Sequence, residues 1–233
     1  MKNWVRYILI LIAVLLLWNT IIIKPLKIFT VFLHELGHAF LAFILGHGII
    51  DFKVNLNESG HTVVYAGNWL SQLFITSGGY LGSIFFALLI LYLKRTPLRK
   101  YILGTISIIF LFVTIRFSGL SFALVFAVLF AIVAILIYMA QNEKIYDWAV
   151  DILGISSVAY AIYDTFVDTI LLELNGWLRI INGWGRSGHM TDAVRMAQIT
   201  GIPAIIWGII WFCIAIFAVY TSLIGRPQPK GRR

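Results

Sequence analysis

The sequence predicts an all-α polytopic membrane protein with about seven transmembrane helices and one small β-hairpin. Of its 233 residues, 61% are hydrophobic and only 12% are charged, whereas a soluble domain carries about 45–50% apolar and about 25% charged residues. The mean hydropathy is +0.92. Apolar runs close to the roughly 20 residues needed to cross a bilayer also recur along the chain. A soluble enzyme and a disordered chain are therefore excluded.

The expected membrane helices follow from these apolar runs, counted in order. The first run could be taken for a signal peptide, but it is long and no small-residue cleavage site follows it, so we interpret it as a retained helix. The runs lie at residues 5–23, 28–45, 68–93, 101–115, 119–140, 148–172 and 203–222. We expect one membrane domain over 1–233, divided into a leading helix (1–27), a catalytic core (28–172) and an interfacial segment with the last helix (173–233).

Two of the connections are long enough to hold structure of their own. Residues 46–67 alternate in polarity, pass through a turn at Asn57–Gly60 and end in a β-prone run, which predicts a hairpin. In the second connection, 173–202, Thr191 or Asp192 could cap a short interfacial helix. From the sequence, Asp192 is better explained as a helix cap than as a metal ligand.

Charge and cysteine content limit the partners. The formal net charge is +8, but the 18 Lys and Arg residues lie in the gaps between apolar runs, as topology requires, and not along one amphipathic face. We therefore expect the lipid bilayer as a partner and no nucleic acid. Cys213 is the single cysteine, so any metal must be held by His, Asp or Glu. The oligomeric state cannot be inferred.

The second apolar run contains a motif that carries chemistry. Residues 34–38 read HELGH, which places His34 and His38 one turn apart on the same face of a helix, where both imidazoles can reach one tetrahedral zinc ion. Glu35 follows the first ligand directly and can act as general base toward a zinc-activated water. This motif predicts a Zn²⁺ site with Glu35 as the catalytic residue.

A catalytic zinc needs a third protein ligand, and the sixth run offers two interior carboxylates, Asp164 and Asp168, spaced i, i+4. Counted from the same side of the membrane, Asp164 lies closer in depth to His38. We therefore expect His34, His38 and Asp164 to bind the metal. Asp168 is then a partner that orients a histidine or holds a proton, or an alternative ligand if the two roles are exchanged.

The motifs together resemble a known family. HELGH in a membrane helix, the hairpin, the small-residue stretch Ser77–Ser83, the later YDTFVD, the TDA at 191–193 and TGIPAIIWGIIW from Thr200 are similar to the site-2 protease family of intramembrane zinc metallopeptidases, in its short branch without a PDZ domain. The resemblance covers most of residues 28–212. It implies zinc held by the two histidines and an aspartate from a later helix, with Glu35 as base. The better-known members place that aspartate in a different local sequence.

The predicted function is intramembrane zinc metalloendopeptidase, acting on peptide bonds of membrane proteins or peptides within or beside the bilayer, in an integral multi-pass protein of a bacterial cell membrane. The predicted hairpin offers a strand edge to an unwound substrate, although a plain interfacial hairpin explains it equally well. The alternative is a non-catalytic metal-binding membrane protein or a divalent-cation transporter that uses the same His/Asp cluster. Glu35 separates the two, because a transport site has no need of a general base beside its first histidine.

Overall fold

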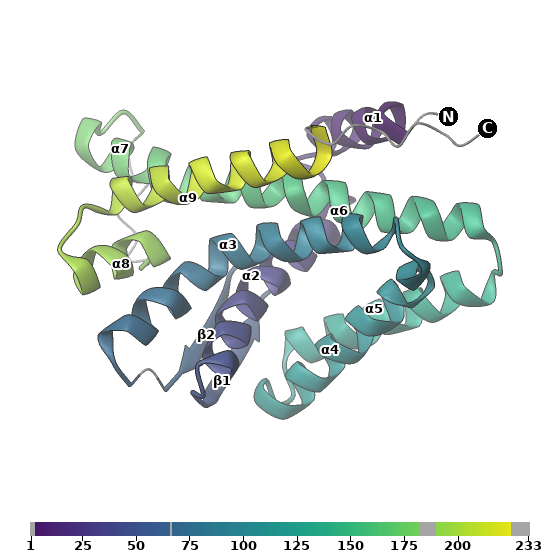
Figure 1. The fold of residues 1–233 in the computed structure, drawn as a ribbon, viewed down its shortest axis with the longest axis horizontal. Coiled ribbons are helices and arrows are strands. Elements are labelled where there is room, and N and C mark those ends of the chain that lie inside the picture. The colour runs from purple at the N-terminus through teal and green to yellow at the C-terminus, as the bar shows by residue number, and fades with distance from the viewer. Residues whose placement is uncertain (1–2, 66, 182–189, 225–233) are drawn as a thin grey trace.

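The computed structural model describes residues 3–65, 67–181 and 190–224. These residues form helices and one two-stranded sheet (Figure 1). The elements, in order, are α1 (Asn3–Leu16), α2 (Lys24–Ile44), β1 (Ile49–Val54), β2 (Gly60–Val64), α3 (Trp69–Leu93), the 3₁₀ helix η1 (Pro97–Tyr101), α4 (Ile102–Phe117), α5 (Phe122–Met139), α6 (Glu143–Phe166), the π-helix η2 (Val167–Leu171), α7 (Leu172–Leu178), α8 (Asp192–Thr200), α9 (Ala204–Val219) and the π-helix η3 (Tyr220–Ile224).

Six of the described helices are long and apolar enough to cross a membrane, which confirms the predicted fold class. The first run is different. Helix α1 has 14 residues, or about 21 Å at 1.5 Å per residue, which is shorter than the roughly 30 Å hydrocarbon core. The run breaks after Leu16, where Thr20 turns its hydroxyl back onto the carbonyl of Leu17. This local bond competes with the continuation of the helix.

The hairpin forms where the alternation predicts it. β1 and β2 are antiparallel, with Phe52 opposite Thr62 and Val54 opposite Gly60. Phe52 is fully buried, and its ring lies 4.9 Å from that of Phe32 on α2. Because that face of β1 packs into the core, the hairpin is fixed against α2.

Helices α2 and α3 touch through glycine. A Cβ on Gly37 of α2 would lie 2.0 Å from the carbonyl oxygen of Gly78 on α3, and a Cβ on Gly82 would lie 2.7 Å from the Cα of Gly37. Such backbone contact is possible only between residues without side chains. The two helices therefore approach closely at the level of the HELGH motif.

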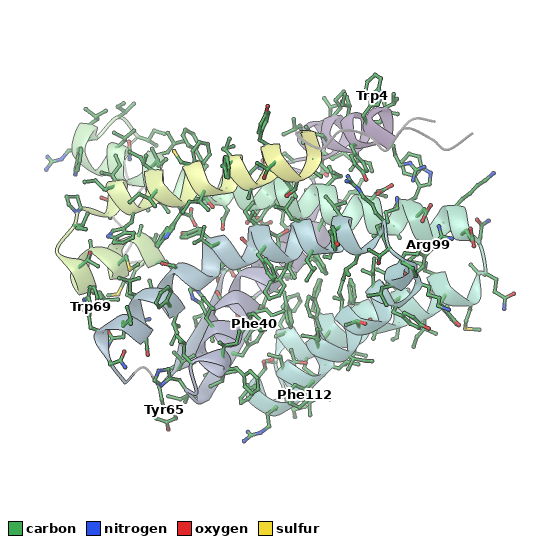
Figure 2. The ribbon with its side chains drawn as sticks, in the orientation of Figure 1. Trp4, Phe40, Tyr65, Trp69, Arg99 and Phe112 are labelled. Atoms are coloured by element: carbon green, nitrogen blue, oxygen red, sulfur yellow. The ribbon has the colours of Figure 1, made fainter. Side chains whose placement is uncertain are left out.

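Two later segments complete the arrangement. The helix that begins with α6 runs without a break through η2 and α7, from Glu143 to Leu178. In Figure 1, α8 lies at one end of the molecule, beside α3 and the start of α9. Buried side chains hold α8 there; they are Tyr80, Ala193, Met196, Ala204 and Trp211. Trp69 also donates its indole N–H to the carbonyl of Ile199 at 2.9 Å, and Figure 2 shows Trp69 beside this end of α8.

Candidate metal centre

The two histidines come from the middle of α2. Pro25 stands in the first turn of this helix, where a missing N–H costs nothing, and the helix continues through the motif without interruption. The imidazole rings of His34 and His38 have centroids 5.0 Å apart. The i, i+4 spacing thus places both rings on one face, as predicted.

The third donor is Asp192, the first residue of α8. Its Oδ2 lies 3.0 Å from Nε2 of His34 and 3.1 Å from Nε2 of His38. Burial alone would raise the pKa of this carboxyl group, but the adjacent His38 and His34 hold the pKa of Asp192 below its usual range. Two imidazole nitrogens and a carboxylate oxygen therefore converge on one point.

Gly79 of α3 closes this group from the opposite side. A Cβ on Gly79 would lie 2.3 Å from Nε2 of His34, 2.5 Å from Nε2 of His38 and 2.6 Å from Oδ2 of Asp192. Zinc–ligand bonds are shorter, at about 2.0–2.2 Å, so the donors would move inward by a few tenths of an ångström to bind a metal there. The three donors thus enclose a space that even a methyl group would fill, and a small cation fits it.

The orientation of His38 is fixed by the backbone. Its Nδ1 lies 2.7 Å from the carbonyl oxygen of Ile75 on α3, so Nδ1 carries the proton and Nε2 is left as an acceptor for a metal. The ring of His34 meets the ring of Tyr80 edge-on at 4.8 Å. Its Nδ1 is buried and has no hydrogen-bond partner among the described residues.

Glu35 is buried beside the donors, with 5% of its surface exposed. Its Oε2 accepts a hydrogen bond of 2.8 Å from the hydroxyl of Thr62 on β2. The predicted base therefore lies between the histidine face of α2 and the hairpin.

A cavity of about 490 Å³ opens over the donors. Its walls come from α2, the hairpin, α3, α6, η2, α7 and α8. The acidic residues lining it are Glu35, Glu58, Asp164, Asp168 and Asp192, against one basic residue of the Lys or Arg type, Arg195, in the described part of the chain. This excess of carboxylates favours a cation.

The structure brings Asp192, and not the expected Asp164, next to the two histidines. Asp164 and Asp168 line the cavity, but the donor group contains Asp192 in place of Asp164. The Nδ1 atom of His38 bonds Ile75, and Nδ1 of His34 has no partner among the described residues, so the role of Asp168 as a proton holder or alternative ligand stays a prediction. The position of Asp164 along α6 favoured it as the third ligand. However, the shorter helix α8 lies between α3 and α9, and its Asp192 carboxylate lies next to the two histidines.

Of the two residues expected to cap this helix, Thr191 is the one that does so. Thr191 is the N-cap of α8, and its hydroxyl accepts from the N–H of Val194 at 3.3 Å. Asp192 therefore does not cap the helix, and its side chain points toward the histidines. The sequence did hold a signal for this residue, the TDA that precedes the tryptophan-containing last helix.

Comparison with known families gives one match. The family model described as Peptidase M50B-like matches residues 7–222. This chain belongs to that family. The match includes α2, the hairpin, α3 and α8, so every residue of the donor group lies within it. It confirms the resemblance to site-2 proteases and identifies the chain, at the level of the family, as a membrane metallopeptidase relative. No curated protein and no solved structure matches the chain.

Proposed function

We propose that the protein is an intramembrane zinc endopeptidase in which His34, His38 and Asp192 bind the metal and Glu35 is the general base. The observation that carries this proposal is the convergence of Nε2 of His34, Nε2 of His38 and Oδ2 of Asp192 beside a buried glutamate. Two histidines and one carboxylate are a donor set typical of catalytic zinc, with the fourth position left for water.

The chemistry divides between the metal and the chain. When bound, zinc supplies an electrophile that acidifies water and polarises a carbonyl group. Glu35 accepts the proton of the attacking water and delivers it to the leaving amine. His38 keeps its Nε2 directed at the site through the bond from Nδ1 to Ile75. The cavity admits the water that a dry membrane interior would exclude.

The substrate class follows from the setting. The protein is an integral multi-pass membrane protein, so we propose membrane proteins or peptides as substrates, cleaved in or beside the bilayer of a bacterial cell membrane. A helical peptide bond has its carbonyl already hydrogen-bonded, and the substrate must therefore unwind into an extended strand before attack.

Strand β2 is suited to receive such an extended segment. Tyr65 directs its N–H toward β1, donating to Gly48 at 2.9 Å. Because neighbouring residues of a strand point their backbone groups to opposite sides, Gly60, Thr62 and Val64 turn theirs away from β1. All three line the cavity, whereas no residue of β1 does so among those described. The free edge of β2 thus faces the metal centre.

A pair of proline variants tests this edge. Val64→Pro removes one outward donor, and Val63→Pro removes an inward one that belongs to the hairpin. We expect Val64→Pro to lower kcat/KM by about tenfold, since one backbone hydrogen bond contributes about 0.5–1.5 kcal/mol. Thermal stability in detergent should drop more for Val63→Pro. Unchanged cleavage by the Val64→Pro protein would leave the hairpin as an interfacial element only.

The deciding experiment compares wild type with Glu35→Gln. Both proteins are purified in detergent, their zinc is quantified, and each is incubated with a library of single-span membrane peptides whose products are read by mass spectrometry. We expect about one zinc per chain in both and cleavage by wild type alone. If neither protein cleaves and both move Zn²⁺ across liposome membranes, the site belongs to a transporter instead.

A further inference from the structure

The hairpin contacts the proposed base directly. The Oγ1 atom of Thr62 lies 2.8 Å from Oε2 of Glu35 and 3.1 Å from its backbone carbonyl oxygen. A hydroxyl group has one hydrogen to donate, so it serves one of these two acceptors at a time. Both acceptors belong to Glu35, and either bond joins β2 to the same residue of α2.

The carboxylate is confined on its other side by Gly60. A Cβ on Gly60 would lie 2.7 Å from Oε1 and 2.8 Å from Cγ of Glu35. The backbone of β2 therefore packs against the glutamate side chain, with no room for a methyl group between them. Together, Gly60 and Thr62 determine where both carboxylate oxygens lie.

The strand that makes these contacts is itself anchored to the helices. Lys27, two turns before Glu35 on α2, lies 3.4 Å from the carboxylate of Glu58 in the turn. On β1, the backbone carbonyl of Phe52 accepts a hydrogen bond from Ser118 after α4. The hairpin is therefore held at its tip and on its far strand, and the Thr62 hydroxyl is presented to Glu35 from a fixed support.

We propose that Thr62 is a positioning residue for Glu35, which makes the hairpin part of the catalytic apparatus as well as a candidate substrate edge. This inference rests on the proposed function. A glutamate side chain has three rotatable bonds, and proton transfer requires its carboxylate within hydrogen-bond reach of the water. A misplacement of about 1 Å is enough to cost a large factor in rate.

Two substitutions separate this role from a structural one. Thr62→Val keeps the shape and the β-propensity but removes the hydroxyl group, whereas Thr62→Ser keeps the hydroxyl group. Thr221→Val, at an exposed site whose hydroxyl bonds its own helix, is the matched control. Zinc per chain, thermal midpoint, kcat and KM are measured for each purified protein with a peptide that the wild type cleaves.

We expect Thr62→Val to lower kcat by about 10- to 100-fold, as for other residues that orient catalytic groups. Zinc content and KM should stay within about twofold of wild type, and Thr62→Ser should recover most of kcat. Thr221→Val should match wild type in all four measurements.

Several results would overturn the role of Thr62. One is a Thr62→Val protein with the kcat of wild type; another is a loss confined to KM, which would assign Thr62 to substrate binding. A loss of zinc or of thermal stability that accounts for the lost rate would make Thr62 structural. In these cases the proposed function stands, provided that Glu35→Gln is inactive. A Glu35→Gln protein as active as wild type overturns the proposed function and the role of Thr62 together.

Discussion

Two groups of buried charges lie at different levels of the same long helix. At the first, Asp151 of α6 is 1% exposed and lies 2.7 Å from Nη1 of Arg6 on α1, and Lys94 at the end of α3 bonds the same carboxylate oxygen. At the second, Asp164 of α6 lines the cavity of the metal centre. The two aspartates are separated by 13 positions of helix, or about 20 Å.

The difference between them is the presence of a counter-charge. In the Asp151 group, the side chains of Arg6 and Lys94 both pair with one carboxylate, which links α1, α3 and α6. The guanidinium of Arg6 also lies over the ring of Trp148, at 5.1 Å. At the candidate metal centre, the Asp192 carboxylate meets two imidazole nitrogens in place of a Lys or Arg side chain. A buried group that holds its own counter-charge fixes structure, whereas one that lacks it is suited to bind an ion from outside.

The strongest test of this contrast places a side chain in the space between the three donors of the candidate metal site. Gly79→Ala should abolish zinc binding and activity, because its methyl group would occupy the space between the three donors. Zinc per chain in the purified protein measures this directly. Gly104→Ala on α4, where a Cβ would meet no atom within 4 Å, is the control and should retain zinc. Full zinc occupancy in Gly79→Ala would show that the metal does not bind between these donors.

The next test concerns which aspartate binds the metal. Asp192→Ala should lower zinc affinity by more than about 100-fold, since it removes a direct donor, beyond the 10- to 100-fold typical of supporting residues. Asp164→Ala, which alters the cavity wall only, should keep most of its zinc. Competition with a chelator of known affinity gives both values. The reverse ranking would restore Asp164 as the ligand and require α8 to lie elsewhere.

The last test belongs to the Asp151 group and concerns stability in place of zinc binding. Asp151→Asn leaves two cations without their counter-charge, and removing one partner of a buried pair costs about 3–5 kcal/mol. Asp147→Asn, whose partner Arg99 is exposed and 3.9 Å away, should cost less than about 1 kcal/mol. Unfolding in detergent mixtures measures both, and zinc content should be normal in the folded fraction. If Asp151→Asn lost zinc before unfolding, the two groups would be coupled.

The sequence by itself determined the fold class, the membrane character and two of the three donors of the candidate metal site. Apolar runs of bilayer length predict spanning helices because lipid demands an internally bonded backbone. His34, Glu35 and His38 could be predicted as site residues because their spacing is local to one helix, and period-two alternation predicted the hairpin for the same reason. Each of these depends on residues a few positions apart.

Only the tertiary structure decided the remaining parts of the site. Asp192 is 154 positions from His38, and Gly79 and Thr62 belong to two further elements. Depth along a helix favoured Asp164, but it could not reveal that α8 folds back between α3 and α9. The first run likewise had the composition of a spanning helix and ended after 14 residues. Which donors meet is set by how helices pack, and packing depends on contacts between distant segments that no local spacing encodes.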